Sequence, residues 1–241
     1  MPKISILVPT RGRRGFLKSL IVSLENTIAD LNSIELLIAY DKDDIMTIRD
    51  LNGIGVKNKP YSFYGRERSD YLNTHYYNWL AKEASGNYLF AVGDDIRFLT
   101  KNWNKLLEDK IEEYLKDKPD RIVYISVNEE GSKAKHPCFP LITKEAFQVL
   151  GEYHCSELLS WGSDRILWEI YSGIGRTLHI PEISIKHLSY HDGSAPFDET
   201  AKSMKERFFR NPNAHNFVSE NIVPKQIEKL KKYIEEFNKN A

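Results

Sequence analysis

The chain has 241 residues, of which 41% are hydrophobic, and its 34 basic side chains are balanced by 34 acidic ones. This length allows one large domain or two small ones with a substantial core. Zero net charge argues against non-specific binding of polyanions. The two cysteines have no zinc-binding spacing, and we find no secretory leader and no apolar run near the roughly 18 residues that span a membrane. We therefore expect a soluble cytoplasmic protein without a structural disulfide.

Strands and helices alternate through the first half of the sequence. Short, β-branched apolar runs predict buried strands, and apolar residues at helical spacing predict amphipathic helices. The predicted strands are 4–8, 34–39, 61–64, 88–92 and 121–127, and the predicted helices are 17–28, 72–80 and 103–114. Such alternation favours parallel strands joined by right-handed crossovers. We therefore predict an α/β fold, a three-layer α/β/α sandwich with a mostly parallel central sheet.

The second half of the sequence has fewer regular elements. Polar residues with Gly and Pro predict a loop over 128–140 that could contact a substrate. Thr143 is expected to cap a helix that starts at the next residue. A further helix is predicted over 163–171, a short strand over 183–188, and an amphipathic C-terminal helix from near Pro224. No linker separates two cores, so we expect one domain with a C-terminal helical tail.

Two adjacent carboxylates, Asp94 and Asp95, follow the predicted strand at 88–92. In an open α/β sheet, ligands bind beyond the carboxyl ends of the strands. Two acids at that place can hold a divalent cation through oxygen ligands. The alternative is an ordinary polar turn, in which Asp is a favoured residue.

Four stretches of the sequence resemble motifs of one enzyme family. ISILVPTRGR is similar to its opening strand and nucleotide loop, and IELLIAYDKDD to its second strand with an Asp that recognises the base. NWLAKEASGNYLFAVGDDI is similar to its helix, central strand and acidic metal motif, and WGSDRILWEI to its later acidic motif at a helix start. The family is that of the glycosyltransferase A fold, in particular family 2-like enzymes that use nucleotide sugars. The resemblance covers about residues 3–190.

The resemblance also implies how the chain is divided. Residues 1–197 would form the catalytic domain, with a nucleotide-sugar half over 1–127 and an acceptor half over 128–197, and residues 198–241 a C-terminal helical extension. The family's metal motif is usually Asp-x-Asp, and Gly93 stands at the first Asp position if Asp95 matches the last. We assign Asp95 to the metal and Asp94 to the nucleotide side, and their division of roles stays open.

A metal is expected because transfer from a nucleotide-diphosphate sugar expels a charged diphosphate. Mn²⁺ or Mg²⁺ would neutralise that leaving group as a Lewis acid. His187 and His191 follow the late strand, where the resembled family often has a third metal ligand, and an imidazole would favour Mn²⁺. Because this segment has the pattern of a strand and a loop, we expect one ligand and assign His187. A structural histidine is the alternative.

The nucleotide would contact residues that follow the first three strands. An Asp at the end of the second strand can accept a hydrogen bond from a pyrimidine imide N–H. Arginines after the third strand can reach the diphosphate as planar donors. The alternatives are a solvated turn with a helix cap and a solvated helix start. The residues assigned to the nucleotide are Pro9, Thr10, Arg11, Arg13, Asp41, Arg66, Arg68 and Asp94.

Asp164 is the candidate catalytic base. An inverting transfer needs a carboxylate that takes the proton of the acceptor hydroxyl. Asp164 opens the predicted helix at 163–171 and matches the family's catalytic motif, and Trp161 beside it could stack on a sugar ring. The alternative is a helix-capping role for Ser163 or Asp164.

These residues together predict a metal-dependent glycosyltransferase that moves a sugar from a nucleotide-diphosphate sugar, with UDP as the expected nucleotide, to an acceptor hydroxyl with inversion. Three alternatives remain: a glycosyltransferase acting on a modified nucleobase in DNA, a sugar nucleotidyltransferase, and a non-catalytic nucleotide-sugar binding module. The short, basic TRGRRG segment argues against the nucleotidyltransferase, whose loop is longer and Gly-rich. The acceptor could be a glycan, a protein, a small molecule or a nucleobase.

Overall fold

The computed structural model describes residues 3–53, 59–131, 136–159, 161–211 and 213–240. Its strands are β1 (Ile4–Thr10), β2 (Ile34–Asp41), β3 (Tyr61–Arg66), β4 (Tyr88–Ala91), β5 (Ile96–Phe98), β6 (Tyr124–Glu130), β7 (Leu141–Thr143) and β8 (Thr177–His187). Within the described residues these eight strands form one sheet in the order β3-β2-β1-β4-β7-β6-β8-β5.

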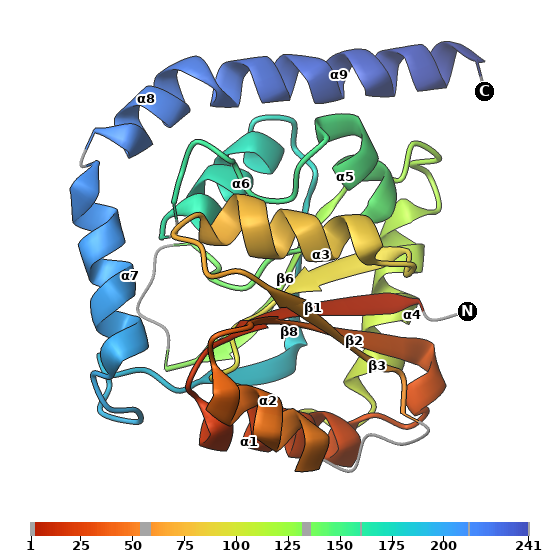
Figure 1. The fold of residues 1–241 in the computed structure, drawn as a ribbon. Coiled ribbons are helices and arrows are strands. Elements are labelled where there is room, and N and C mark those ends of the chain that lie inside the picture. Colours follow the sequence, from red (N-terminus) through yellow and green to blue (C-terminus); the bar gives the residue numbers. More distant parts are fainter. Residues whose placement is uncertain (1–2, 54–58, 132–135, 160, 212, 241) are drawn as a thin grey trace.

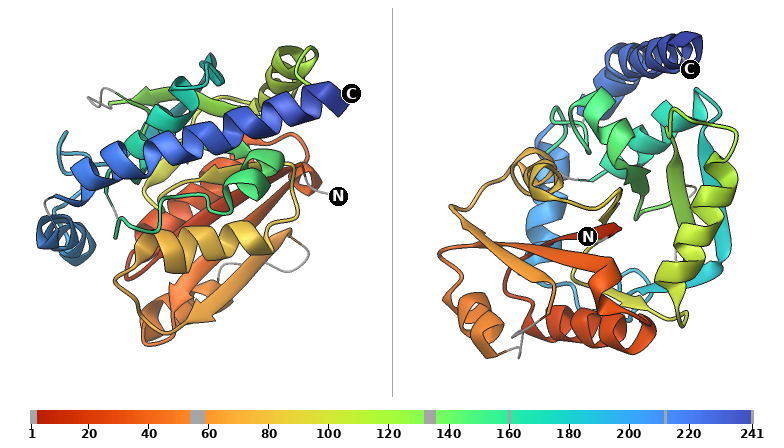
Figure 2. Two further views of the ribbon diagram at one scale, coloured as in Figure 1. Left: turned by 90° about the horizontal axis from the view of Figure 1, so that it is seen from above. Right: turned by 90° about the vertical axis from the view of Figure 1, so that its right-hand side faces the viewer.

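Helices cover both faces of this sheet. They are α1 (Arg14–Thr27), α2 (Ile45–Gly53), α3 (Asn78–Glu83), α4 (Trp103–Leu115), α5 (Lys144–Leu150), α6 (Ser163–Ser172), α7 (Glu199–Arg210), α8 (Ala214–Asn221) and α9 (Val223–Asn240). Figure 1 shows α1 and α2 on one side of the sheet and α3, α5 and α6 on the other. The long α9 lies across α5 and α6 (Figure 2). None of the helices in the described part of the chain is long and apolar enough to cross a bilayer.

The alternation of side chains along the strands explains the three layers. On β1, Ile4, Ile6 and Val8 pack with α1 and α4, whereas Leu7 points to the opposite face, towards α3, α5 and α6. Successive side chains of a strand point to opposite faces, so a buried central strand is apolar on both. Trp103 of α4 is fully buried on the first face. The predicted three-layer α/β fold is therefore confirmed.

The two halves of the sheet differ in strand direction. β3, β2, β1 and β4 run parallel to one another, as expected from the alternating pattern. β7 is antiparallel to β4 and β6, and β5 is antiparallel to β8, while β6 and β8 are parallel. The sheet is thus mixed, with its parallel half formed by the first part of the chain.

Several element boundaries differ from the prediction. The strand predicted at 121–127 begins at Tyr124, because Arg121 has a left-handed backbone with φ 56 that a strand cannot contain. The strand predicted at 183–188 is longer and spans Thr177–His187. β5 and β7 were not predicted, since three residues are too few to show a period.

Two further predictions about the second half need correction. Thr143 does stand at the N-cap of α5, but its side chain makes no capping hydrogen bond. The predicted loop over 128–140 begins as strand, since β6 continues through Glu130, and residues 132–135 of it lie outside the described part. The C-terminal tail consists of α7, α8 and α9, and α9 begins at Val223, next to the predicted start.

Gly86, in the turn between α3 and β4, packs closely against β1. Its N–H donates to Ser5 Oγ at 2.9 Å and to Glu35 Oε1 at 3.1 Å. A Cβ at this position would lie 2.6 Å from Ser5 Oγ and 2.9 Å from Ser5 N. We expect Gly86→Ala to lower the free energy of unfolding by about 1–3 kcal/mol, because the turn would have to move away from β1.

Urea denaturation of Gly86→Ala and of a matched variant, Gly15→Ala, tests this expectation. A Cβ at Gly15 in α1 would meet no atom within 4 Å. Gly15→Ala should leave stability equal or raise it, because Ala is the better helix former. Equal free energies of unfolding for the two variants would contradict the close packing at Gly86.

Candidate active site

The carboxyl ends of the parallel strands open into a cavity of about 1020 Å³. Ten of the residues assigned from the sequence line it: Pro9, Thr10, Arg11, Arg13, Asp41, Arg68, Asp94, Asp95, Asp164 and His187. The exception is Arg66, which is not among the lining residues. Its guanidinium lies over the rings of Tyr76 and Trp79, at 5.0 and 5.6 Å from their centroids, and donates to the His75 carbonyl.

Asp94 and Asp95 leave β4 in different environments. Asp94 is buried, and its carboxylate accepts hydrogen bonds from Thr10 Oγ1 at 2.8 Å and from Arg13 Nη1 at 3.2 Å. Burial and the neighbouring Asp95 raise the pKa of Asp94 to about 7. Burial also opposes ionisation of Asp95, but His187 and Arg13 outweigh it and hold the pKa of Asp95 below its usual range. Both carboxylates line the cavity, and Asp95 is the one of the pair whose charged form is favoured.

Gly93 makes room for this arrangement. A Cβ at Gly93 would lie 2.4 Å from Asp95 Oδ1. No real side chain tolerates that distance, so the carboxylate of Asp95 depends on a glycine two positions before it. This is the position at which the sequence departs from the Asp-x-Asp pattern, and an Asp at 93 would displace the Asp95 carboxylate from its observed place.

The pairing of β5 with β8 brings His187 to Asp95. Ile96 pairs with His187, and the N–H of Leu188 donates to the Asp95 carbonyl at 2.9 Å. His187 Nε2 consequently lies 3.7 Å from Asp95 Oδ1. The ring of Phe139 packs edge-on against the His187 imidazole, with centroids 4.9 Å apart. The strand pairing and the Phe139 ring thus both hold the imidazole beside the Asp95 carboxylate.

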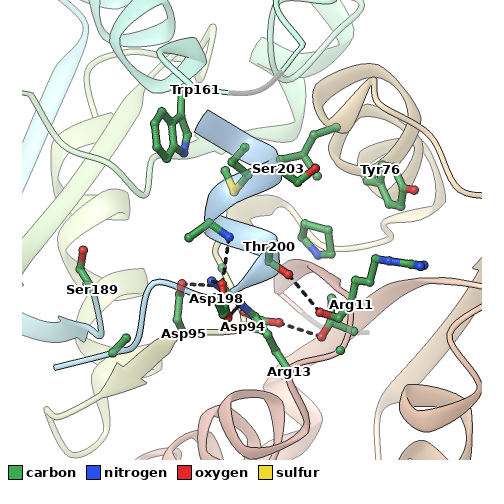
Figure 3. Close-up of a pocket in the computed structure, with 18 of the residues that line it drawn as sticks. Arg11, Arg13, Tyr76, Asp94, Asp95, Trp161, Ser189, Asp198, Thr200 and Ser203 are labelled. Carbon is green, nitrogen blue, oxygen red and sulfur yellow. Dashed lines mark hydrogen bonds and ion pairs between the residues drawn. The ribbon is translucent and has the colours of Figure 1, made fainter. Parts of the chain in front are cut away.

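Arg13 connects the acidic pair to the C-terminal helices (Figure 3). Its Nη1 lies 2.8 Å from Asp95 Oδ2, and its Nε and Nη2 donate to the two carboxylate oxygens of Asp198 at 2.7 and 2.9 Å. Asp198 is the N-cap of α7 and also accepts from the N–H of Ala201. The first turn of α7 therefore forms one wall of the cavity, next to Asp94 and Asp95.

At the end of β2, Arg11 and Tyr76 fix Asp41. Arg11 Nη1 donates to Asp41 Oδ2 at 2.8 Å, and the Tyr76 hydroxyl donates to Asp41 Oδ1. Burial and Asp41 together raise the pKa of Tyr76 to about 12, so its hydroxyl remains a donor. Arg11 also pairs with Asp43. The carboxylate of Asp41 has a fixed orientation at the end of β2.

Asp164 also lines the cavity and lies in the first turn of α6, which begins after Gly162. Gly162 has φ 83, a left-handed backbone that favours glycine. Trp161 lines the cavity beside it, and Figure 3 shows its ring on the side opposite Arg11. Asp164 Oδ2 is 3.3 Å from His136 Nε2. This wall combines a carboxylate, an imidazole and an aromatic face.

The residues that sequence reasoning missed are Tyr76, His136 and Asp198. Tyr76 was assigned to the apolar face of a helix, and His136 lies in a segment predicted only as a loop. The sequence before α7 indicates a helix start, since Asp198 is a favoured N-cap residue. No local pattern indicates that Asp198 pairs with Arg13, 185 residues away.

A divalent cation fits the residues around Asp95. Among the described residues, no three His, Cys, Asp or Glu side chains are already grouped as a ligand set. Mg²⁺, however, is commonly held by one or two carboxylates together with substrate phosphates and water. Asp95 and His187 supply a carboxylate and an imidazole side by side, and Asp94 adds a second carboxylate next to them, which Arg13 also contacts.

The two histidines of the late segment have different surroundings. His187 is the last residue of β8, whereas His191 is exposed in the following turn, with its ring against Tyr190 at 4.0 Å. We expect His187→Ala to weaken Mn²⁺-dependent turnover of a nucleotide sugar more than His191→Ala does, because only His187 lies next to Asp95. Initial rates at several Mn²⁺ concentrations measure this, and the reverse order would contradict the assignment of His187.

The structure is similar to solved glycosyltransferases. S. aureus TarS (residues 1–349) aligns with a TM-score of 0.63 and 15% identity over 93% of this chain and 77% of that one. The same TarS segment in complex with UDP-GlcNAc aligns with a TM-score of 0.63 and 15% identity over 96% of this chain and 80% of that one.

A mannosyltransferase, PcManGT from Pyrobaculum calidifontis in complex with GDP-Man and Mn²⁺, also aligns. Its TM-score is 0.64, with 11% identity over 96% of this chain and 74% of that one. No protein-family model and no curated protein sequence matches the chain. The chain has the fold of these nucleotide-sugar glycosyltransferases, as its motifs led us to expect.

Proposed function

We propose that this protein is a metal-dependent glycosyltransferase that transfers a sugar from a UDP-linked donor to an acceptor hydroxyl with inversion. The observation that carries the proposal is that Asp41, Asp95, His187 and Asp164, from four separate stretches of sequence, line one cavity. Of the similar solved structures, TarS is in complex with UDP-GlcNAc, and PcManGT is in complex with GDP-Man and Mn²⁺. A nucleotide-sugar donor and a divalent metal are therefore the natural ligands to test.

Each group of residues has a part in the proposed reaction. The oriented carboxylate of Asp41 accepts a hydrogen bond from the nucleobase, and Thr10, Arg11 and Arg68 border the nucleotide. Asp95 and His187 would hold the metal, which when bound supplies Lewis-acid stabilisation of the diphosphate leaving group. Asp94 remains hydrogen-bonded to Thr10 and supports this arrangement.

The acceptor side is formed by Trp161 and Asp164. The indole offers a flat apolar face on which a sugar ring can stack. Asp164 takes the proton from the acceptor hydroxyl as its oxygen attacks the anomeric carbon from the face opposite the diphosphate. A base that acts on the face opposite the diphosphate gives inversion, and Asp164 is the carboxylate we propose for that role.

A panel of nucleotide sugars tests the proposal without knowledge of the acceptor. Each donor is incubated with the protein and Mn²⁺, and free nucleotide is measured with water as the acceptor. We expect one UDP-sugar to be hydrolysed with Mn²⁺ and not with EDTA. Absence of hydrolysis, together with absence of nucleotide binding by calorimetry, would contradict the proposed function.

A further inference from the structure

His136 is the immediate neighbour of Asp164 on the wall of the cavity. The two residues come from different segments, His136 from the chain before β7 and Asp164 from the first turn of α6. His136 Nε2 lies 3.3 Å from Asp164 Oδ2, and the side chains are 23% and 20% exposed. Both line the cavity, so the contact is formed at the edge of the space that a substrate would enter.

A partly buried carboxylate, that of Glu129, fixes the segment to which His136 belongs. Glu129, near the end of β6, accepts the N–H groups of Cys138 at 2.8 Å and Phe139 at 3.0 Å. The Phe139 ring then packs against His187. The chain from His136 to Phe139 is therefore anchored between β6 and the residues near Asp95, and it presents the imidazole to α6.

The charges around His136 favour its protonated form. The contact with Asp164 is the main influence and raises the pKa of His136; burial and Arg165 oppose the rise, and Glu129 adds to it. A protonated imidazole beside a carboxylate gives a charge-assisted interaction, which is stronger and more directional than one between neutral groups. The contact can therefore hold the carboxylate in one orientation.

We infer that His136 is a positioning residue for Asp164: it engages Oδ2 and leaves Oδ1 to receive the proton of the acceptor hydroxyl. The inference rests on the proposed function. In the step, the hydroxyl proton passes to Asp164, the acceptor oxygen bonds to the anomeric carbon, and the bond from that carbon to the diphosphate breaks with its electrons leaving on the diphosphate. His136 gains and loses no proton. It acts by orientation, and a misplacement of about 1 Å can cost about 100-fold in rate.

NMR titration of the histidine rings tests the contact without any activity. His136→Gln assigns the His136 signal. In Asp164→Asn the pKa of His136 should fall, because the carboxylate that raises it is gone. The ring signal of His179, an exposed histidine on β8, is the reference in the same spectra. If the His136 titration is the same in the parent protein and in Asp164→Asn, the inference is wrong.

Kinetics test the positioning role, with the UDP-sugar hydrolysed in the donor panel as substrate. His136→Ala should lower kcat by up to about 100-fold with unchanged UDP affinity, and His136→Gln, whose amide can donate to Oδ2, should recover part of it. His179→Ala should match the parent. In the Asp164→Asn background, His136→Ala should cost nothing more, because it acts through Asp164.

The outcomes separate this inference from the proposed function. Additive losses in the double variant, or full turnover in His136→Ala when Asp164→Asn is inactive, would overturn the positioning role alone. Full turnover in Asp164→Asn would instead remove Asp164 as the base, and the proposed function would need another one.

Discussion

Asp164→Asn is expected to lower sugar transfer by about 10²–10⁴ while UDP and Mn²⁺ bind as in the parent protein. The loss follows because an amide cannot take the proton of the acceptor hydroxyl. Binding is retained because Asp164 belongs to α6 and is not among the residues assigned to the nucleotide or the metal. Turnover of the donor and calorimetry of UDP with Mn²⁺ measure the two quantities separately.

Glu169→Gln is the matched control for this variant. Glu169 lies on the same helix, where it pairs with Arg165 and accepts from the Ser219 hydroxyl, and it does not line the cavity. Transfer by Glu169→Gln should be close to that of the parent. If both variants lose transfer equally, the loss reflects the packing of α6 and not the chemistry of Asp164.

The stereochemistry of the product gives an independent test of the same base. A base that activates the acceptor for attack from the face of the sugar opposite the diphosphate inverts the anomeric carbon. With an α-linked donor we expect a β-linked product by NMR. An α-linked product would mean retention, and Asp164 would then be a helix-start or acceptor-binding residue.

The parallel half of the sheet and its ligand edge could be predicted because each strand there is a buried apolar run that ends in polar residues. Asp41 and Asp94 follow two such runs, and parallel strands place their carboxyl ends along one edge. Thr10, at the end of β1, then donates a hydrogen bond to the Asp94 carboxylate. The strand pattern was sufficient because these strands are long enough to show it.

The other half of the site depends on contacts that no local pattern contains. β5 has three residues, yet its pairing with β8 determines where His187 lies relative to Asp95. Asp198 indicates a helix start by its residue type, whereas its pairing with Arg13 follows from the path of the chain after β8. Arg66 differs from the other assigned residues: its position after the predicted strand at 61–64 suggested a phosphate contact, whereas in the structure its guanidinium lies over the rings of Tyr76 and Trp79.

Asp95→Asn should abolish the Mn²⁺-dependent part of UDP binding, and Asp94→Asn should weaken it less. Asp95 is the more exposed carboxylate, at 15% against 4% for Asp94, and lies beside His187. Asn at 94 can still accept the hydrogen bond from Thr10 Oγ1. Loss of a supporting residue typically costs about 10- to 100-fold in metal affinity, and loss of Asp95 as a direct ligand should exceed this. Calorimetry of UDP with Mn²⁺ and with EDTA measures the difference.

Arg13 complicates this experiment because it contacts both acids, so either substitution also loosens its guanidinium. Asp198→Asn is the control, since it weakens the hold on Arg13 and leaves Asp94 and Asp95 intact. We expect Asp198→Asn to retain Mn²⁺-dependent UDP binding. Equal loss in Asp198→Asn and Asp95→Asn would mean that Arg13, by contact with the diphosphate, provides the affinity and that Asp95 acts only as its partner. Retained binding in Asp198→Asn with loss in Asp95→Asn would assign the metal to Asp95. Both variants remove a carboxylate partner of Arg13, but only Asp95→Asn removes the carboxylate that would bind the metal.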